Sequence, residues 1–204
     1  IELCNKHPRV NLHQPGPGVG GHCLAIDPWF IIEKTPQLAR ITELSRKIND
    51  SMPAHVLGRI DSILHGIKGR RKVTILGVSY KPNIDDTRKS PILELINLLE
   101  DKGDYGISAY DPHVKTYKYQ AKDLMEAAKK SDLIVLAVNH DEFKHLPLNE
   151  MGQVMRNKNL FDTRNFLSQD EVEEKGFKYW LLGSGLPEGE VVKLDEVAVA
   201  REGI

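Results

Sequence analysis

Between residues 70 and 182, short runs of β-branched and other apolar residues alternate with longer amphipathic stretches. This alternation is typical of βα units, in which each strand joins a parallel sheet and each helix covers one face of it. The sequence therefore predicts a Rossmann-like α/β domain of about five strands, with ligands bound at the carboxyl ends of the strands. The expected strands are 73–78, 106–110, 133–138, 159–161 and 178–182, and the expected helices are 91–102, 121–130 and 168–175.

Before this region, apolar residues recur at helical spacing over residues 36–67, with a break at Pro53. The pattern predicts one long helix, or two helices that meet near Pro53, because proline removes a backbone donor inside a helix. We divide the chain into residues 1–68, which hold a loop and the long central helix, residues 69–182, which form the sheet domain, and residues 183–204, an extended tail.

Composition excludes several classes of protein. Basic and acidic residues number 28 and 29, and a net charge of -1 gives no global field that would steer the chain onto nucleic acid or an anionic membrane. No run approaches the ~20 apolar residues that a membrane helix needs, and no signal peptide precedes the first motif. The two cysteines, Cys4 and Cys23, have neither disulfide-framework nor metal-binding spacing. We expect a cytoplasmic protein without a bound metal and, because its most unusual motif follows so soon after Ile1, a fragment.

That motif is the segment 14–21, whose density of proline and glycine excludes a regular helix or strand. Three of its glycines match the GxGxxG spacing, but a dinucleotide fingerprint also needs a strand before it and a helix directly after it. We expect neither, because prolines interrupt any strand and Pro28 blocks a long helix that starts at Gly21. The segment is predicted to be a loop that lets a ligand approach its backbone and that ends at Cys23.

Cys23 has two interpretations on these grounds. A free cysteine is usually a small buried hydrophobic residue. A thiol at the mouth of a glycine loop is instead within reach of a substrate and of backbone N–H groups that favour the thiolate. For Asp27, which follows in the same segment, the alternative to a role in a site is a carboxylate at a helix N-terminus.

Two blocks of sequence resemble the UDP-glucose/GDP-mannose dehydrogenase family. PGPGVGGHCLAIDP, residues 15–28, is similar to the family's catalytic-cysteine segment. Together with the preceding His7-Pro8-Arg9-Val10, it is most similar to the UDP-N-acetyl-D-mannosamine dehydrogenase branch. ILGVSYKPNIDDTRKSP, residues 75–91, resembles the strand-to-helix loop of the family's UDP-binding domain.

The resemblance implies an NAD-dependent oxidoreductase that converts the primary alcohol of a UDP-sugar to a carboxylate in two hydride transfers. In such chemistry a thiolate adds to the intermediate aldehyde, and the resulting thiohemiacetal is oxidised to a thioester that water hydrolyses. The resemblance implies that Cys23 is this nucleophile and that Asp27 handles protons or water beside it. NAD is expected to bind mainly to a domain that this sequence does not contain.

The resemblance also assigns contacts with ligands. It places His7, Arg9, Gly20, Tyr80, Lys81 and Arg164 on the UDP-sugar substrate and Arg88 on NAD. Tyr80 stands where the family often has phenylalanine, and Arg164 where many relatives in this branch have lysine. For Arg88 the alternative is a surface ion pair with Asp85 or Asp86, which would contribute little to stability.

Further expectations follow from what the family has and this sequence lacks. The lysine and asparagine that act on substrate from the preceding helix have no counterpart, so we expect no dehydrogenase turnover from this chain alone. The central helix resembles the family's dimer-forming helix, which implies a homodimer.

Three other interpretations stay open. They are a non-catalytic nucleotide-sugar-binding or dimerisation module, a dehydrogenase of UDP-glucose or another UDP-hexose, and a cysteine hydrolase. The hydrolase needs a histidine base, and His22 is expected to be poorly placed because it adjoins Cys23 in the sequence.

Overall fold

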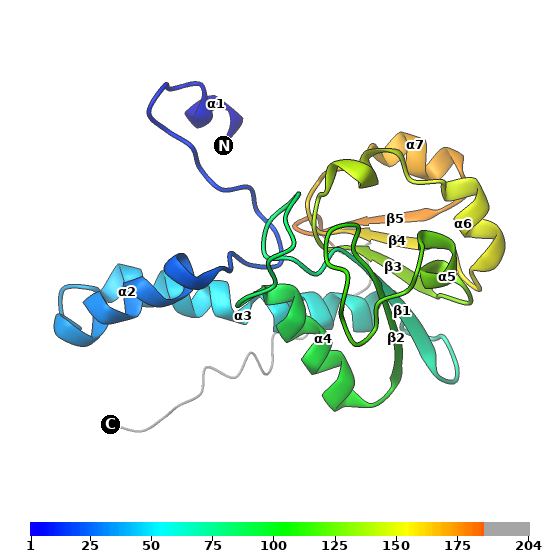
Figure 1. Cartoon of the computed structure of the whole chain (residues 1–204), viewed down its shortest axis with the longest axis horizontal. Helices are drawn as coiled ribbons and strands as arrows, with labels where there is room; N and C mark the ends of the chain where they lie inside the picture. The colour runs from blue at the N-terminus through cyan, green and yellow to red at the C-terminus, as the bar shows by residue number, and fades with distance from the viewer. Residues whose placement is uncertain (186–204) are drawn as a thin grey trace.

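The computed structural model describes residues 1–185 and contains one parallel sheet of five strands in the order β2-β1-β3-β4-β5 (Figure 1). The strands are β1 (Arg71–Leu76), β2 (Tyr105–Tyr110), β3 (Leu133–Leu136), β4 (Asn159–Asp162) and β5 (Lys178–Leu181). All five predicted strands are confirmed, with small shifts at their ends. The extended tail expected for residues 183–204 lies, from residue 186 on, outside the described residues.

Helices precede the sheet and connect its strands. They are α1 (Glu2–Asn5), α2 (His22–Lys34), α3 (Arg40–Ile63), α4 (Pro91–Lys102), α5 (Leu124–Ala128), α6 (Leu148–Val154) and α7 (Gln169–Glu174), with a 3-10 helix η1 (Asp141–His145). The predicted helices of the sheet domain are confirmed as α4, a shortened α5, and α7. Both η1 and α6 were missed, because elements of five and seven residues are too short to show a clear apolar period.

The strands are apolar on both sides because helices cover both faces of the sheet. In β3, Leu133 and Val135 belong to the core that α3 and α4 form on one face. Ile134 and Leu136, which alternate with them, belong to the core beneath α6 and α7 on the other face. This two-layer covering leaves the ends of the strands as the places where loops can build a site.

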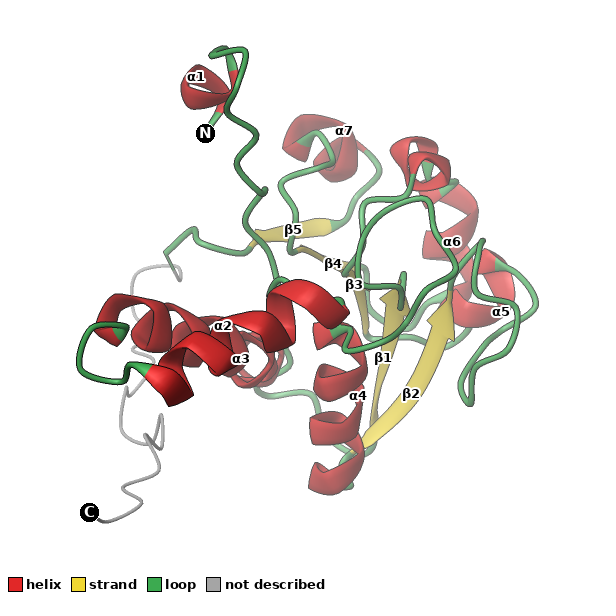
Figure 2. Ribbon diagram, turned by 60° about the vertical axis from the view of Figure 1, so that its left-hand side comes forward, coloured by secondary structure: helices red, strands yellow, loops and turns green. Residues whose placement is uncertain are grey.

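Helix α3 is one continuous helix of 24 residues that passes through Pro53. Its second half buries Val56 and Ile60 against α4 and the sheet, whereas its first half packs against α2 to one side of the sheet domain (Figures 1 and 2). No helix among residues 1–185 combines the length and apolar character needed to cross a membrane.

Helix α2 contradicts the expectation that Pro28 prevents a helix from starting after Gly21. It runs for 13 residues from His22, with Gly21 as its N-cap and Pro28 inside it. Pro28 removes the donor that would bond the carbonyl of Leu24, but Leu24 is exposed, so water can satisfy that carbonyl. Residues 10–20 contain no strand, so the GxGxxG spacing has only half of the context that a dinucleotide fingerprint requires.

Gly77 supports the first turn after β1, and we predict that Gly77→Ala lowers the free energy of unfolding by about 2–5 kcal/mol. Its φ is +87°, which costs a non-glycine residue about 1–2 kcal/mol. A Cβ there would also lie 2.4 Å from Cβ of Val138, and overpacking of this kind costs about 1–3 kcal/mol. Urea unfolding followed by circular dichroism measures the loss.

Gly69→Ala is the matched control, because Gly69 has a φ of +83° but no atom within 4 Å of the added Cβ. It should show only the backbone cost. Equal losses of stability in the two variants would contradict the packing contribution assigned to Val138.

Candidate functional site

The candidate site lies at the carboxyl edge of the sheet, where β1 and β3 are neighbours. After β1 the chain crosses to β2 on one side, and it then returns to β3 on the other side. In doubly wound folds ligands bind at such a switch point, because the two loops separate there and leave a crevice. The loop of residues 77–90 follows β1, and Arg164 follows β4 at the same edge.

The glycine loop, residues 16–21, packs its backbone directly against these elements. A Cβ at Gly16 would lie 2.4 Å from a guanidinium nitrogen of Arg164. A Cβ at Gly20 would lie 2.3 Å from the carbonyl oxygen of Lys89. Side chains at these positions would push the loop away from the sheet. Gly20 thus has a packing role, and the substrate contact assigned to it stays a prediction.

The other two glycines complete the contact. Gly18 has a φ of +131°, and its position faces Pro91 at the start of α4. Gly21 has a φ of +87° and faces the ring of Tyr80, where a Cβ would lie 3.0 Å from the nearest ring atom. The glycine loop therefore fixes the start of α2 against the loop that follows β1.

Asn49 of α3 holds the middle of the glycine loop. Its side-chain oxygen accepts the backbone N–H of Val19 at 2.7 Å, and its amide nitrogen donates to the carbonyl oxygen of Val19 at 3.1 Å. The sequence analysis missed this residue, because one polar residue in an amphipathic helix gives no signal of its own. The site thus depends on α3 as well as on the sheet.

Cys23 is exposed at the second position of α2. The buried alternative for this residue is therefore wrong, and Cys4 is exposed as well. Nδ1 of His22 lies 3.2 Å from the sulfur of Cys23, so the expectation that His22 cannot face its neighbour's thiol is also wrong. The first turn of α2 presents a thiol and an imidazole together.

Asp27 is exposed in the second turn of α2, not at its N-terminus, so the capping alternative for this carboxylate is wrong. It follows Cys23 by four residues, and side chains at that spacing are neighbours on one face of a helix. The helix therefore places a carboxylate one turn from the thiol, which agrees with the role that the resemblance implies for Asp27.

Arg88 forms the ion pair with Asp86 that the sequence analysis considered as an alternative. A nitrogen of its guanidinium lies 2.6 Å from the Asp86 carboxylate, and the Arg88 side chain is otherwise exposed. Hydrogen bonds from Arg88 lower the pKa of Asp86 to about 2. Electrostatic interactions also connect Arg88 with Cys23 and Tyr80, so the ion pair stands beside the thiol.

Arg164 is a half-buried cation at the end of β4. Its Nε donates to the carbonyl oxygen of Ala137 at 2.8 Å, and its backbone N–H donates to Asp162. Burial lowers the pKa of Arg164 to about 10, and the Asp162 charge opposes this shift. Among residues 1–185, no carboxylate forms an ion pair with its guanidinium. Such a cation is suited to receive an anionic ligand, because the ligand supplies the missing charge.

Tyr80 and Lys81 lie next to each other in the loop after β1. The Lys81 ammonium is exposed and stands 5.7 Å from the centre of the Tyr80 ring, which also faces Gly21. The structure therefore brings Tyr80, Lys81, Arg88 and Arg164 to one edge of the sheet together with Cys23.

His7 and Arg9 are not brought to this edge. Figure 1 shows α1 and the segment after it standing away from the sheet. Both residues are exposed, and the Arg9 backbone N–H donates to His7 Nδ1 at 3.3 Å. Their substrate contacts stay predictions without support from this arrangement.

A buried network that the sequence analysis missed holds the loop after β1. His140 follows β3, its Nδ1 accepts the backbone N–H of Asn83 at 2.9 Å, and its Nε2 lies 3.1 Å from the Asp111 carboxylate. Burial alone would raise the pKa of Asp111. Hydrogen bonds from His140 and from the N–H groups of Val78 and Val114 outweigh burial and hold that pKa below its usual range. The network ties the ends of β1, β2 and β3 together.

His113 and Glu142 lie close enough to His140 for the three side chains to surround an ion, with ligand atoms within 4.8 Å of one another. Both ring nitrogens of His140, however, already have protein partners. A metal would have to displace one of these hydrogen bonds, so we assign no metal to this cluster.

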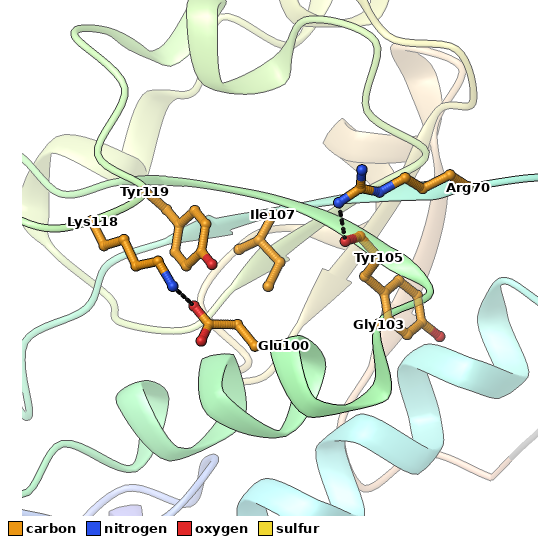
Figure 3. A pocket seen from close by; sticks show the side chains of 7 residues that line it. All are labelled: Arg70, Glu100, Gly103, Tyr105, Ile107, Lys118 and Tyr119. Carbon is orange, nitrogen blue, oxygen red and sulfur yellow. Dashed lines mark hydrogen bonds and ion pairs between the residues drawn. The ribbon is translucent and has the colours of Figure 1, made fainter.

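A separate cavity of about 200 Å³ lies along the outer edge of β2, away from Cys23 (Figure 3). Both cations that line it have protein partners: Arg70 donates to the carbonyl oxygen of Tyr105, and Lys118 pairs with Glu100 at 2.8 Å. The cavity therefore differs from the Arg164 site, where the cation has no carboxylate partner within the described part of the chain.

We predict that Arg88→Gln raises the pKa of Asp86 from about 2 toward the usual aspartate value of ~3.9, because the guanidinium stabilises the ionised carboxylate. Because the pKa of Asp86 is lower in the folded state than in the unfolded state, the ion pair stabilises the fold at pH values above the unfolded-state pKa of ~3.9. This contribution disappears as the pH falls through about 2. NMR titration of the Asp86 carboxyl carbon measures the shift. Arg9→Gln, in the projecting segment, is the control, and an unchanged titration in Arg88→Gln would refute the assignment.

Comparison with known families matches both parts of the site. The model described as "UDP-glucose/GDP-mannose dehydrogenase family, UDP binding domain" matches residues 74–169, which include the loop after β1 and Arg164. The model of the same family's central domain matches residues 1–51, which include the glycine loop and Cys23. The two matches together include well over half of the chain.

Curated relatives agree with these matches. The chain is 43% identical over 188 residues to the UDP-N-acetyl-D-mannosamine dehydrogenase of Methanocaldococcus jannaschii, a match that covers 91% of this chain and 43% of the relative. It is 35% identical over 177 residues to the NDP-N-acetyl-D-galactosaminuronic acid dehydrogenase of Ralstonia nicotianae, covering 84% of this chain and 41% of the relative.

Solved structures show the same fold. A UDP-N-acetyl-mannosamine dehydrogenase from S. aureus superposes with a TM-score of 0.72 at 41% identity, covering 88% of this chain and 42% of that one. A UDP-D-ManNAc dehydrogenase from Pyrococcus horikoshii gives 0.75 at 36% identity, covering 90% and 43%. The chain spans less than half the length of these proteins. Its fold, its site segments and these matches agree, and the chain belongs to the UDP-glucose/GDP-mannose dehydrogenase family.

Proposed function

We propose that this chain is the carboxy-terminal part of an NAD-dependent UDP-N-acetyl-D-mannosamine 6-dehydrogenase. One observation carries the proposal: the glycine loop brings the Cys23 thiol to the edge of the sheet at which the half-buried Arg164 has no carboxylate partner among residues 1–185. A nucleophile and an unmatched cation at one edge suit a substrate with a diphosphate at one end and a reacting carbon at the other. The identity to UDP-N-acetyl-D-mannosamine dehydrogenases supports the choice of sugar.

The proposed substrate-binding residues act through charge and planarity. Arg164 offers a rigid guanidinium that can donate two parallel hydrogen bonds to a phosphate or a carbonyl group of the nucleotide. Lys81 adds an exposed, mobile charge, and the flat ring of Tyr80 lies between Lys81 and the glycine loop. We propose that these three residues hold the UDP portion and direct the sugar toward α2.

The proposed reaction needs a nucleophile that keeps the aldehyde bound between two oxidations. When bound, NAD accepts the hydride in each of them. Cys23 would add to the aldehyde carbon, and Asp27, one turn further along α2, would orient or deprotonate the water that hydrolyses the thioester. Retaining the aldehyde on sulfur prevents its release before the second oxidation.

Arg88 is the one NAD contact that we propose for this chain, and its geometry fits such a contact. It directs Nε and one terminal nitrogen at Asp86. Within the described residues its other terminal nitrogen has no protein acceptor, so one donor is free for a phosphate oxygen. The ion pair would hold the side chain in place for that contact.

We predict that UDP-N-acetylmannosamine slows the alkylation of Cys23 by iodoacetamide, because the bound sugar covers the thiol. Arg164→Gln should weaken this protection by roughly 10–100-fold in ligand concentration, since hydrogen bonds to charged groups contribute about 1.5–3 kcal/mol. Mass spectrometry of the alkylated peptides measures both cysteines in one sample, and Cys4 serves as the internal control.

Comparison of ligands separates the alternatives. Protection by UDP-glucose at lower concentration than by UDP-N-acetylmannosamine would favour the UDP-hexose alternative. Binding of UDP-sugars, detected by calorimetry, without protection of Cys23 would favour a non-catalytic binding module. Absence of binding by the folded chain would contradict a preformed UDP-sugar site.

We also propose that the chain forms a homodimer through the first half of α3. Ile41, Leu44 and Ile48 recur at helical spacing and are 83%, 59% and 56% exposed. Phe30 and Ile31 of the adjoining α2 are also more than half exposed. An apolar stripe of this length on two packed helices is typical of a surface that another subunit covers.

We therefore predict that Ile41→Glu converts a dimer into a monomer, because a carboxylate introduced into the stripe would be buried without a partner. Sedimentation velocity measures the change in mass. Arg40→Glu is the control, since adjacent helix residues point in different directions. A wild-type chain that sediments as a monomer at all concentrations would contradict the proposal.

A further inference from the structure

We propose that His22 is the base that takes the proton from the Cys23 thiol, an inference that rests on the proposed role of Cys23 as nucleophile. Nδ1 of His22 lies 3.2 Å from the sulfur of Cys23. A nucleophile and a base within hydrogen-bond reach are the requirement for an activated thiol. The family resemblance assigned no role to His22, so this contact adds a residue to the proposed site.

The start of α2 explains how two adjacent residues meet. Gly21, with a φ of +87°, turns the chain so that His22 and Cys23 become the first two helical residues. Nδ1 is the ring nitrogen nearer to the backbone, and it can reach the short side chain of the next residue while Nε2 points away. Both side chains are exposed, so the pair is open to a substrate.

Charged groups of the loop after β1 lie near the pair. Electrostatic interactions link the pair to Asp86 and Arg88, and Asp27 lies one turn further along α2. The Asp86 carboxylate interacts electrostatically with His22. The Arg88 guanidinium interacts electrostatically with Cys23. The Asp86–Arg88 ion pair therefore presents a charge of opposite sign to each partner.

Cys23 lies in the first turn of α2. The N–H groups of the first helical turn have no partner within the helix, and they carry the positive end of the helix dipole. A thiolate at the second position of a helix of 13 residues is stabilised by these groups. Cys4 is exposed too, but it lies in a helix of four residues, and no imidazole among residues 1–185 forms a hydrogen bond with its sulfur.

The step balances as follows. The S–H bond of Cys23 breaks, its electron pair stays on sulfur, and the proton moves to Nδ1 of His22. The thiolate then forms a C–S bond with the aldehyde carbon of the first oxidation product, while the carbonyl π pair moves to the oxygen. The imidazolium returns its proton to that oxygen, so the products are a neutral thiohemiacetal and neutral His22.

The test is the pH dependence of Cys23 alkylation in a Cys4→Ser background, in which Cys23 is the one remaining cysteine. At neutral pH an ordinary cysteine is only a few per cent thiolate. We expect His22→Gln to lower the alkylation rate at neutral pH by roughly tenfold and to approach the parent rate at alkaline pH, where no base is needed. The ultraviolet absorbance of the thiolate should show the same shift.

Two controls make the result specific. His13→Gln removes another exposed histidine of the same region and should leave the profile unchanged. Thermal unfolding of each variant confirms the fold. An unchanged profile in His22→Gln would overturn the proposal, and so would a rate that falls equally at neutral and alkaline pH, because that indicates lost access instead of a lost base.

The outcome is independent of the proposed function. Alkylation of the free chain needs neither UDP-sugar nor NAD. If UDP-sugars fail to protect Cys23 while His22→Gln still slows neutral alkylation, the substrate assignment fails and the His22 role stands. If UDP-sugars protect Cys23 but His22→Gln reacts like its parent, the substrate assignment stands and the His22 role fails.

Discussion

The contact between the glycine loop and the carboxyl edge of the sheet determines where every proposed catalytic group lies. Added side chains at Gly16 and Gly20 would come within 2.4 Å and 2.3 Å of Arg164 and Lys89, distances that no packed atoms adopt. With hydrogen at these positions, the backbone can approach the loop after β1 and the start of α2 is fixed beside it. Cys23 and the proposed substrate-binding residues Lys81 and Arg164 can thus belong to one site because Gly16 and Gly20 carry no side chains.

The electrostatics of the site divide into matched and unmatched charges. Asp86 and Arg88 neutralise each other at the surface, as do Lys118 and Glu100 beside the edge cavity. Arg164 differs, because burial lowers its pKa, the Asp162 charge opposes this shift, and no carboxylate among residues 1–185 forms an ion pair with it. A protein retains such a cation at a cost in stability, and binding of an anion offsets that cost. This difference in charge pairing distinguishes the site at the carboxyl edge of the sheet from the cavity of Figure 3, whose cations have protein partners.

Periodicity was sufficient to predict the sheet, because its strands are apolar on both faces and are separated by helices long enough to show their own pattern. It failed at α2, where the argument from Pro28 assumed that a lost backbone hydrogen bond is prohibitive. In an exposed helix water replaces that bond, so the cost is moderate. Because this helix was not expected, His22 was predicted to be poorly placed to face the Cys23 thiol. For the same reason Asp27 was considered as a carboxylate at a helix N-terminus, whereas it lies one helical turn after Cys23. Asn49, Asp111 and His140 act through tertiary hydrogen bonds that no local pattern encodes.

Helix α3 connects the site with the proposed dimer interface. Its second half is buried beneath the sheet, its residue Asn49 holds the glycine loop through two hydrogen bonds, and the preceding Ile48 belongs to the exposed apolar stripe. Pro53, four residues further on, cannot donate to the carbonyl of Asn49, and this carbonyl faces Gly18 at 3.3 Å from its ideal Cβ. Covering the stripe would therefore restrict the same helical turn that positions the loop. The proposed subunit association and the geometry around Cys23 would therefore share one helix, and a change in α3 would affect both.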